Sequence, residues 1–231
     1  MEKINLNNVT LIGIDCVDVK RLQTALDISQ EGINFAETKL LSSIKNDDPR
    51  WVEIDHLGSI EAFSEFCIKE LINFVDTEYV LLVQYDGFIL NPQSWSDSFL
   101  EYDYIGAPWY IKDEFWFEMF NIPRELTGQH IVGNGGFSLR SKKFLKISSQ
   151  LAKENKFSKY HPEDLVMCVY DKHLLDAQGI KFAPYEIAKK FSIEGHDEDY
   201  ESQFGFHGLK WTNISKWIEL NPQYGIKQIP K

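Results

Sequence analysis

Short apolar runs alternate with segments in which apolar residues recur every three or four positions. The β-branched run 9–16 predicts a first strand, and 35–43 predicts a second. Between them, 19–29 has helical spacing and is expected to end at Gly32. Another helix is expected from a Ser59 cap to about residue 71. This alternation predicts an α/β fold of the Rossmann-like type, with a mainly parallel central sheet flanked by helices.

The run 80–83, within an extended segment 78–90, is apolar on both faces and predicts a central strand. Aromatic residues crowd the irregular stretch 95–120, and a glycine-rich turn follows at 133–136. Pro162 predicts the start of a long helix that reaches about residue 177. Since no repeat or linker interrupts the chain, we interpret 1–231 as a single domain, with 211–231 as a carboxyl-terminal extension whose role is open.

The charge balance narrows the range of partners. The net charge is -11, so the chain gains no counterion release on nucleic acids and is repelled by anionic lipids. It has neither an apolar run of 18 residues nor a signal-peptide pattern, and we expect a cytoplasmic protein without membrane insertion. A peripheral position at the inner membrane is left open. Cys16, Cys67 and Cys168 lie far apart in apolar segments, which indicates buried free thiols.

Polar residues follow the central strand directly: Gln84, Tyr85 and Asp86. Open α/β sheets bind ligands beyond the carboxyl ends of their strands. Asp86, followed by Gly87, suits a divalent cation that bridges to a diphosphate, because such cations often take one or two protein carboxylates beside phosphate oxygens. The alternative is that Asp86 and Gly87 only begin a turn.

Two further segments suggest backbone and carboxylate chemistry. In 133–136, three glycines around Asn134 allow positive φ angles and close approach of the backbone to a ligand, although a plain tight turn needs no more. Glu163 and Asp164 follow Pro162, where acidic groups favour a helix start. The functional alternative makes one of these carboxylates a general base for an acceptor hydroxyl.

Aromatic and histidine positions complete the candidates. His207 lies between the glycine-flanked aromatics of 204–208, which predicts a loop that closes over a pocket or, alternatively, a structural histidine. Trp109 and Trp116 lie in the aromatic-rich stretch, where flat rings can support a sugar face or simply pack in the core.

The order of these segments resembles the conserved elements of GT-A glycosyltransferases. The strings 83–92, 102–109, 133–140 and 204–208 also resemble a bacterial family of short GT-A-like proteins associated with surface polysaccharide synthesis, and the similarity runs from about 9 to 208. The resemblance implies transfer of a sugar from a nucleotide-diphosphate-sugar donor to a saccharide, a glycolipid or another hydroxyl acceptor.

The resemblance also implies roles for individual residues. Asp86 matches the aspartate of the Asp-x-Asp motif that holds Mn²⁺ or Mg²⁺, and His207 matches a late histidine that completes the metal site or touches the diphosphate. Gln84 replaces the first aspartate of the motif, which removes a charge and leaves open how strictly a cation is needed. Asp164 matches the base of inverting members, with Glu163 beside it. The implied donor-site residues are Asp15, Gln84, Tyr85, Asp86, Gly133, Asn134, Gly135 and Gly136.

Two other functions stay open at this point. A nucleotidyltransferase uses a similar sheet, but usually has a basic, glycine-rich loop after the first strand, and 13–18 has no such cluster. A carbohydrate- or nucleotide-binding protein that kept the fold without catalysis is favoured by Gln84. Release of nucleotide from a donor would separate an enzyme from a binding protein.

Overall fold

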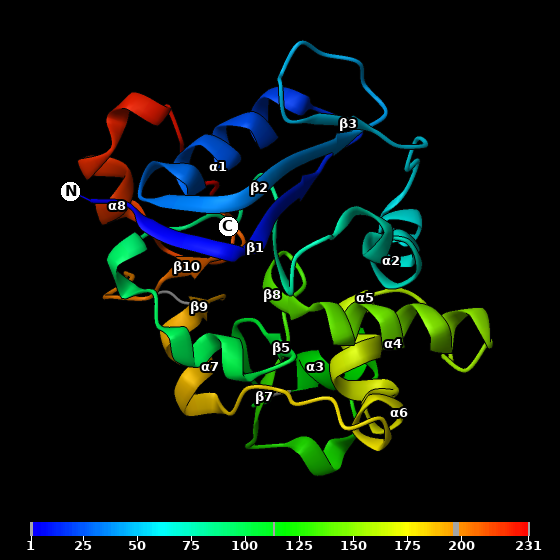
Figure 1. Ribbon diagram of the computed structural model, residues 1–231. Helices are drawn as coiled ribbons and strands as arrows, with labels where there is room; N and C mark the ends of the chain where they lie inside the picture. Colours follow the sequence, from blue (N-terminus) through cyan, green and yellow to red (C-terminus); the bar gives the residue numbers. More distant parts are fainter. Residues whose placement is uncertain (1, 113, 196–198, 231) are drawn as a thin grey trace.

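The computed structural model describes residues 2–112, 114–195 and 199–230. A central sheet has the strand order β3-β2-β1-β4-β8-β5 (Figure 1). Its strands are β1 (Ile4–Ile14), β2 (Ile33–Ser42), β3 (Trp51–Glu53), β4 (Tyr79–Val83), β5 (Tyr104–Ile105) and β8 (Phe137–Ser141). β1 pairs in parallel with β2 and β4, and β2 with β3, whereas β8 runs antiparallel to β4 and β5. The expected mainly parallel sheet is confirmed.

Helices cover both faces of the sheet. Their bounds are α1 (Val19–Glu31), α2 (Ile60–Lys69), α3 (Glu114–Phe120), α4 (Lys142–Lys153), α6 (Lys172–Ala177), α7 (Tyr185–Phe191) and α8 (Ser215–Leu220). Because side chains alternate along β4, Leu81 and Val83 pack with α1 and α7, whereas Val80 and Leu82 pack with α2 and α4. The doubly apolar run therefore lies in a central strand with helices on both sides.

The helix starts follow from capping side chains. The Ser59 hydroxyl accepts from the backbone N–H of Ala62 at 3.2 Å, which confirms the predicted start of α2. Asp18 caps α1 in the same way, by accepting from Lys20 N at 3.0 Å. β1 begins at Ile4, earlier than expected, because its first residues pair with β2 from Ile33 onward. All three cysteines are buried and free, as predicted.

The long helix predicted from Pro162 to about residue 177 is wrong. The segment divides into α5 (Glu163–Leu165), a π-helical turn (Val166–Tyr170) and α6. Asp171 separates them: its φ is −113°, and its buried carboxylate accepts hydrogen bonds from the N–H and hydroxyl of Ser158 at 2.7 and 2.8 Å. A contact with a preceding loop thus overrides the helical pattern at this residue.

Two small sheets lie beside the main one. β6 (Pro108–Tyr110) pairs antiparallel with β7 (His130–Val132), and β9 (Ser192–Ile193) pairs in parallel with β10 (Gly205–Phe206). After β10 the chain returns to the α1 side, where Trp217 of α8 packs in a buried cluster with Ala25 and Ile28 of α1. The segment after residue 210 therefore contributes to the core of the described structure.

Candidate functional site

Three chain segments meet at one edge of the central sheet. Gly13 of β1 pairs with Val83 of β4, and Val83 pairs with Phe137 of β8. β1 and β4 end at this row, whereas the antiparallel β8 begins there. The topology therefore brings together Asp15, the polar residues 84–86 and the glycine-rich loop 133–136.

The small parallel sheet adds two side chains to this edge. Phe206 of β10 pairs with Ile193 of β9, so the next residues, His207 and Glu194, leave the sheet side by side. The backbone N–H of Gly208 donates to the carbonyl of Asp86 at 2.8 Å, which joins this sheet to the turn after β4. His207 and Asp86, which are far apart in the sequence, are thus brought together.

His207 is surrounded by polar groups. Its Nδ1 lies 2.7 Å from Oε1 of Glu194 and 2.9 Å from Nδ2 of Asn134. Its Nε2 lies 3.1 Å from Oε1 of Gln84 and 3.5 Å from Oδ1 of Asp86. Burial alone lowers the pKa of His207, but the hydrogen bond and charge of Glu194 outweigh it and raise the pKa to about 9. The ring therefore carries a positive charge at neutral pH and donates from both nitrogens.

Glu194 is one residue of the candidate site that the sequence analysis missed. Its Oε2 accepts from Nε1 of Trp109 at 2.5 Å, and its Oε1 faces His207. Burial works to raise the pKa of Glu194, but the hydrogen bonds from His207, Trp109 and Asn134 lower it below its usual value. The available sequence signal was that Glu194 follows Phe-Ser-Ile much as His207 follows Phe-Gly-Phe, with a small residue between two large apolar ones.

Asp164 reaches the glycine-rich loop. Its Oδ2 accepts from the N–H of Gly135 at 3.0 Å and its Oδ1 from the N–H of Leu165 at 2.8 Å. Burial and then the neighbouring Glu163 carboxylate raise the pKa of Asp164 to about 7, against the opposing hydrogen bond from Gly135. A carboxylate with this pKa can gain and lose a proton near neutral pH.

Glu163 points the other way. It is buried, and its Oε1 lies 3.3 Å from Nη2 of the fully buried Arg140, with Ser64 Oγ 3.5 Å from its Oε2. The same Nη2 donates to the carbonyl of Gly135 at 3.3 Å. Glu163 thus forms an ion pair with Arg140 beside Gly135, whereas the carboxylate of Asp164 accepts a hydrogen bond from the loop backbone.

The glycines of 133–136 do not adopt positive φ angles. Only Asn134 has a positive φ, 62°, so the expectation that the glycines would supply such angles is wrong. The glycines instead leave room for neighbouring side chains. A methyl group would lie 2.2 Å from the Trp109 ring at Gly133, 1.9 Å from Glu163 Oε1 at Gly135 and 2.1 Å from His207 Nε2 at Gly136.

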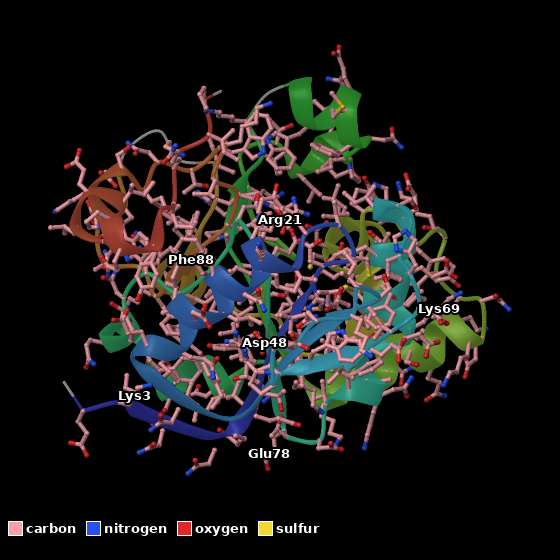
Figure 2. All side chains as sticks on the ribbon, turned by 90° about the horizontal axis from the view of Figure 1, so that it is seen from above. Lys3, Arg21, Asp48, Lys69, Glu78 and Phe88 are labelled. Atoms are coloured by element: carbon pink, nitrogen blue, oxygen red, sulfur yellow. The ribbon has the colours of Figure 1, made fainter. Side chains whose placement is uncertain are left out.

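Both carboxylate oxygens of Asp15 are bound by groups of the protein. The residue is buried, its Oδ1 accepts from the N–H groups of Val17 and Asp18, and its Oδ2 pairs with Nε of Arg21 at 2.6 Å. The Arg21 guanidinium lies 3.8 Å from the centre of the Tyr85 ring. Arg21 was absent from the predicted site, yet its side chain is 36% exposed and places a positive charge at this edge (Figure 2).

The two predicted acceptor tryptophans lie close to each other, with ring centroids 5.6 Å apart. Trp109 is only 8% exposed and holds Glu194, whereas Trp116 is partly buried in the same apolar cluster. Their contact with an acceptor stays a prediction.

Asp86 is the residue that fits a cation. Its Oδ1 is buried and accepts no hydrogen bond from the residues that the structure describes. Within the same residues no group of three or more His, Cys, Asp or Glu side chains is arranged for a metal ion. A cation at Asp86 would therefore rely on ligand oxygens for much of its coordination.

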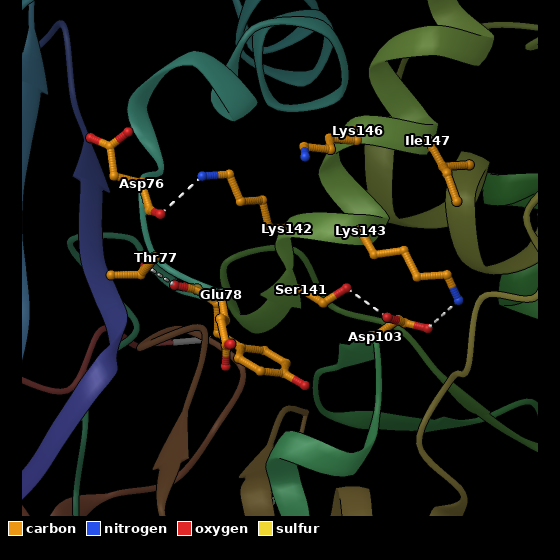
Figure 3. Close-up of a pocket in the computed structure, with 10 residues that line it drawn as sticks. Asp76, Thr77, Glu78, Asp103, Ser141, Lys142, Lys143, Lys146 and Ile147 are labelled. Carbon is orange, nitrogen blue, oxygen red and sulfur yellow. Dashed lines mark hydrogen bonds and ion pairs between the residues drawn. The ribbon is translucent and has the colours of Figure 1, made fainter.

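A hollow of about 580 Å³ lies at the other end of β4 (Figure 3). In Figure 2, Glu78, which lines it, lies at the lower edge of the view, away from Arg21. Lys142 donates to the carbonyl of Asp76 at 2.9 Å, and Lys143 pairs with Asp103 at 3.2 Å. Because these charges are satisfied within the protein, the polar cluster around His207 is the better candidate site.

The described residues form an α/β fold of the GT-A-like, Rossmann-like type. The chain belongs to the family described as "Protein of unknown function (DUF5672)", whose model matches residues 50–207. No curated protein matches the chain. Among the described residues, no helix has both the length and the apolar character that a bilayer span requires.

Several solved structures align with the chain at low sequence identity. The galactosyltransferase LgtC, in complex with donor and acceptor sugar analogs, aligns with a TM-score of 0.50 and 12% identity over 96% of this chain and 98% of LgtC. The mannosyltransferase PcManGT from Pyrobaculum calidifontis, in complex with GDP-Man and Mn²⁺, aligns with a TM-score of 0.43 and 13% identity over 78% of this chain and 55% of that one. The bifunctional IspDF from Campylobacter jejuni aligns with a TM-score of 0.45 and 12% identity over 76% of this chain. The alignment covers 48% of IspDF, so this chain spans about half the length of that protein.

Proposed function

We propose that this protein is a glycosyltransferase that transfers a sugar from a nucleotide-diphosphate-sugar donor to a hydroxyl group of a saccharide or glycolipid acceptor. The observation that carries the proposal is the meeting of Asp86, His207 and Asp164 around the loop 133–136, at the ligand-binding edge of a GT-A-like sheet. The fold shared with LgtC supports the class of protein, and the side chains support the chemistry.

The proposed mechanism divides the charges of the reaction between two groups. Sugar transfer develops negative charge on the departing diphosphate, and the N–H at Nε2 of His207 donates to a diphosphate oxygen. Asp86, whose Oδ1 accepts no hydrogen bond from the described residues, would hold a divalent cation. Such a cation, when bound, would neutralise charge on the leaving group. His207 is assigned to the diphosphate rather than to the metal because both its ring nitrogens already face oxygen atoms.

Asp164 acts as the base. In its ionised form it accepts the proton of the attacking acceptor hydroxyl, while the N–H of Gly135 holds the carboxylate in place. Arg21 and Tyr85 lie on the side of Asp86 nearer β1, where we place the nucleoside. The surface-polysaccharide role implied by the resemblance belongs to the same proposal.

A binding and turnover screen tests the proposal. The chain is mixed with nucleoside diphosphates and nucleotide sugars, with and without Mn²⁺ or Mg²⁺, and its thermal unfolding and nucleotide release are measured. A true ligand at 100 times its Kd stabilises the fold by about 2.7 kcal/mol. Asp86→Ala should lose the cation-dependent part of nucleotide affinity in calorimetry and keep its fold.

The outcomes separate the candidate functions. Binding with slow release of nucleotide and free sugar supports a glycosyltransferase. Binding of a nucleotide sugar without any release, in the presence of varied acceptors, would instead identify a binding protein. An Asp86→Ala variant with unchanged cation-dependent affinity would remove Asp86 from the site.

A further inference from the structure

We infer that Glu194 is a positioning residue: it fixes the ring of His207 so that Nε2 points toward Gln84 and Asp86. The contact itself is independent of any ligand. Its consequence, presentation of Nε2 to a diphosphate, rests on the proposed function.

The backbone leaves the ring free to turn. The N–H of His207 donates to the carbonyl of Ile193 at 3.0 Å, which fixes the main chain but not the rotation of the imidazole about its Cβ–Cγ bond. A half-turn about that bond would exchange the ring nitrogens for ring carbons at both contacts. The 2.7 Å contact between Nδ1 and Oε1 of Glu194 favours one orientation, and a hydrogen bond between charged groups is among the stronger ones.

Trp109 in turn holds Glu194. Its indole N–H donates to Oε2, so both oxygens of the carboxylate are bound and the group cannot rotate without breaking a hydrogen bond. The Trp109 ring is 8% exposed and packs where Gly133 has no side chain. Hydrogen bonds therefore connect the buried ring of Trp109, through Glu194, to the ring of His207, which is 17% exposed at the candidate site.

The far side of the ring faces the place for the ligand. Oε1 of Gln84, 3.1 Å from Nε2, occupies the position that a diphosphate oxygen would take, and Oδ1 of Asp86 lies 3.5 Å from the same nitrogen. A ring in the flipped orientation would present carbon there. Glu194 thus affects diphosphate binding without touching the diphosphate.

The test uses the full chain and the variants Glu194→Gln, Trp109→Phe and their combination. A glutamine offers one oxygen and one NH₂ group, so an oxygen facing His207 forces its NH₂ against the indole N–H of Trp109. Trp109→Phe removes that indole donor. The matched control is Glu186→Gln, which alters an exposed carboxylate of α7 that pairs only with Lys189 among the ion pairs of the described residues.

Two measurements follow. The ¹⁵N spectrum of the His207 ring reports which nitrogens carry protons and hydrogen bonds. Calorimetry reports the affinity for inorganic pyrophosphate and, as a reference, for a nucleoside. We expect Glu194→Gln to change the Nδ1 signal and to weaken pyrophosphate binding by roughly 10- to 100-fold, as for a lost hydrogen bond to a charged group. Nucleoside affinity should not change, and adding Trp109→Phe should restore part of the pyrophosphate affinity.

The outcomes are distinct. A His207 spectrum that is the same in wild type, Glu194→Gln and Glu194→Ala would overturn the inference, whatever the ligand data show. A changed spectrum with recovery in the double variant supports it. If the wild-type chain binds neither pyrophosphate nor any nucleoside diphosphate, the proposed function fails, while the spectrum still decides the role of Glu194.

Discussion

Adjacent carboxylates can have opposite surroundings, as Glu163 and Asp164 do. Glu163 is buried against the guanidinium of Arg140, whereas Asp164 lies against the N–H of Gly135 at the site. The sequence predicted that this pair matters, because acidic residues follow a proline at a helix start. The acidic pair alone did not predict which carboxylate lies at the candidate site, since that depends on Arg140 from a distant strand, whereas the resemblance assigned this place to Asp164.

The Asp164→Asn variant should change the stability of the fold and the turnover in opposite directions. The pKa of Asp164 is raised from 3.8 to about 7, so the folded state holds this proton more tightly than the unfolded chain does. Its contribution to the free energy of unfolding is therefore complete below pH 4 and is lost as the pH rises through about 7. At pH 8 the variant should be more stable than wild type, by at most roughly 4 kcal/mol, and by less because Asp164 is partly exposed.

Ionisation of Asp164 should raise turnover, although it lowers the free energy of unfolding. Wild-type activity should rise as the pH passes through about 7, because only ionised Asp164 accepts a proton. Asp164→Asn should lower turnover by roughly 10²- to 10⁴-fold and keep donor affinity. Glu163→Gln is the comparison: it leaves Arg140 without its ionic partner and should destabilise the fold by about 3–5 kcal/mol. Near-normal turnover in Asp164→Asn, measured by nucleotide release, would show that another group is the base.

Elements of very different length build the site. β1, β4 and α1 are long or strongly apolar, and the sequence pattern located them because many residues contribute to the same signal. β9 and β10 have two residues each, too few for a periodic pattern, so their pairing was not predictable and Glu194 went unnoticed. The loop 133–136 was recognised from its glycines, but the reason for them lies in side chains that arrive from three other elements.

Gly136→Ala tests that reason. The added methyl group would come within 2.1 Å of Nε2 of His207, so the ring must move. We expect a loss of about 1–3 kcal/mol in the free energy of unfolding, as for other overpacked sites, together with weaker binding of pyrophosphate. Gly58→Ala is the matched control, because its nearest neighbour, a ring atom of His56, is 3.7 Å away. Equal behaviour of the two variants in denaturant titration and calorimetry would contradict the packing role of Gly136.

At the scale of the whole molecule, the carboxyl-terminal segment supports the site from behind. Phe88 follows Asp86 by two residues, and Phe206 immediately precedes His207. Their rings meet edge to face with centroids 4.8 Å apart, and Trp217 packs on Phe88 at 5.1 Å. The family model ends at residue 207, yet the cluster that joins the two site segments is completed by a residue beyond it.

Trp217→Ala should therefore weaken both the fold and the site. Trp217 is 5% exposed, and its indole N–H donates to the carbonyl of Leu90 at 3.1 Å. Loss of this side chain should lower the free energy of unfolding by about 3–5 kcal/mol. Trp211→Ala, at a position 53% exposed, should change it by less than about 0.5 kcal/mol.

The affinity for pyrophosphate shows whether Trp217 supports the site residues or contributes only to the stability of the core. If Trp217 holds Phe88 and Phe206 in register, the Trp217→Ala variant should bind pyrophosphate more weakly even at a temperature where it is fully folded. Trp211→Ala should bind it as wild type does. Unchanged affinity in folded Trp217→Ala would mean that the backbone bonds between β10 and the turn after β4 suffice. The hydrogen bond from the N–H of Gly208 to the carbonyl of Asp86, at 2.8 Å, is the shortest backbone hydrogen bond between these two segments in the described structure. It would then hold His207 in place without the aromatic cluster.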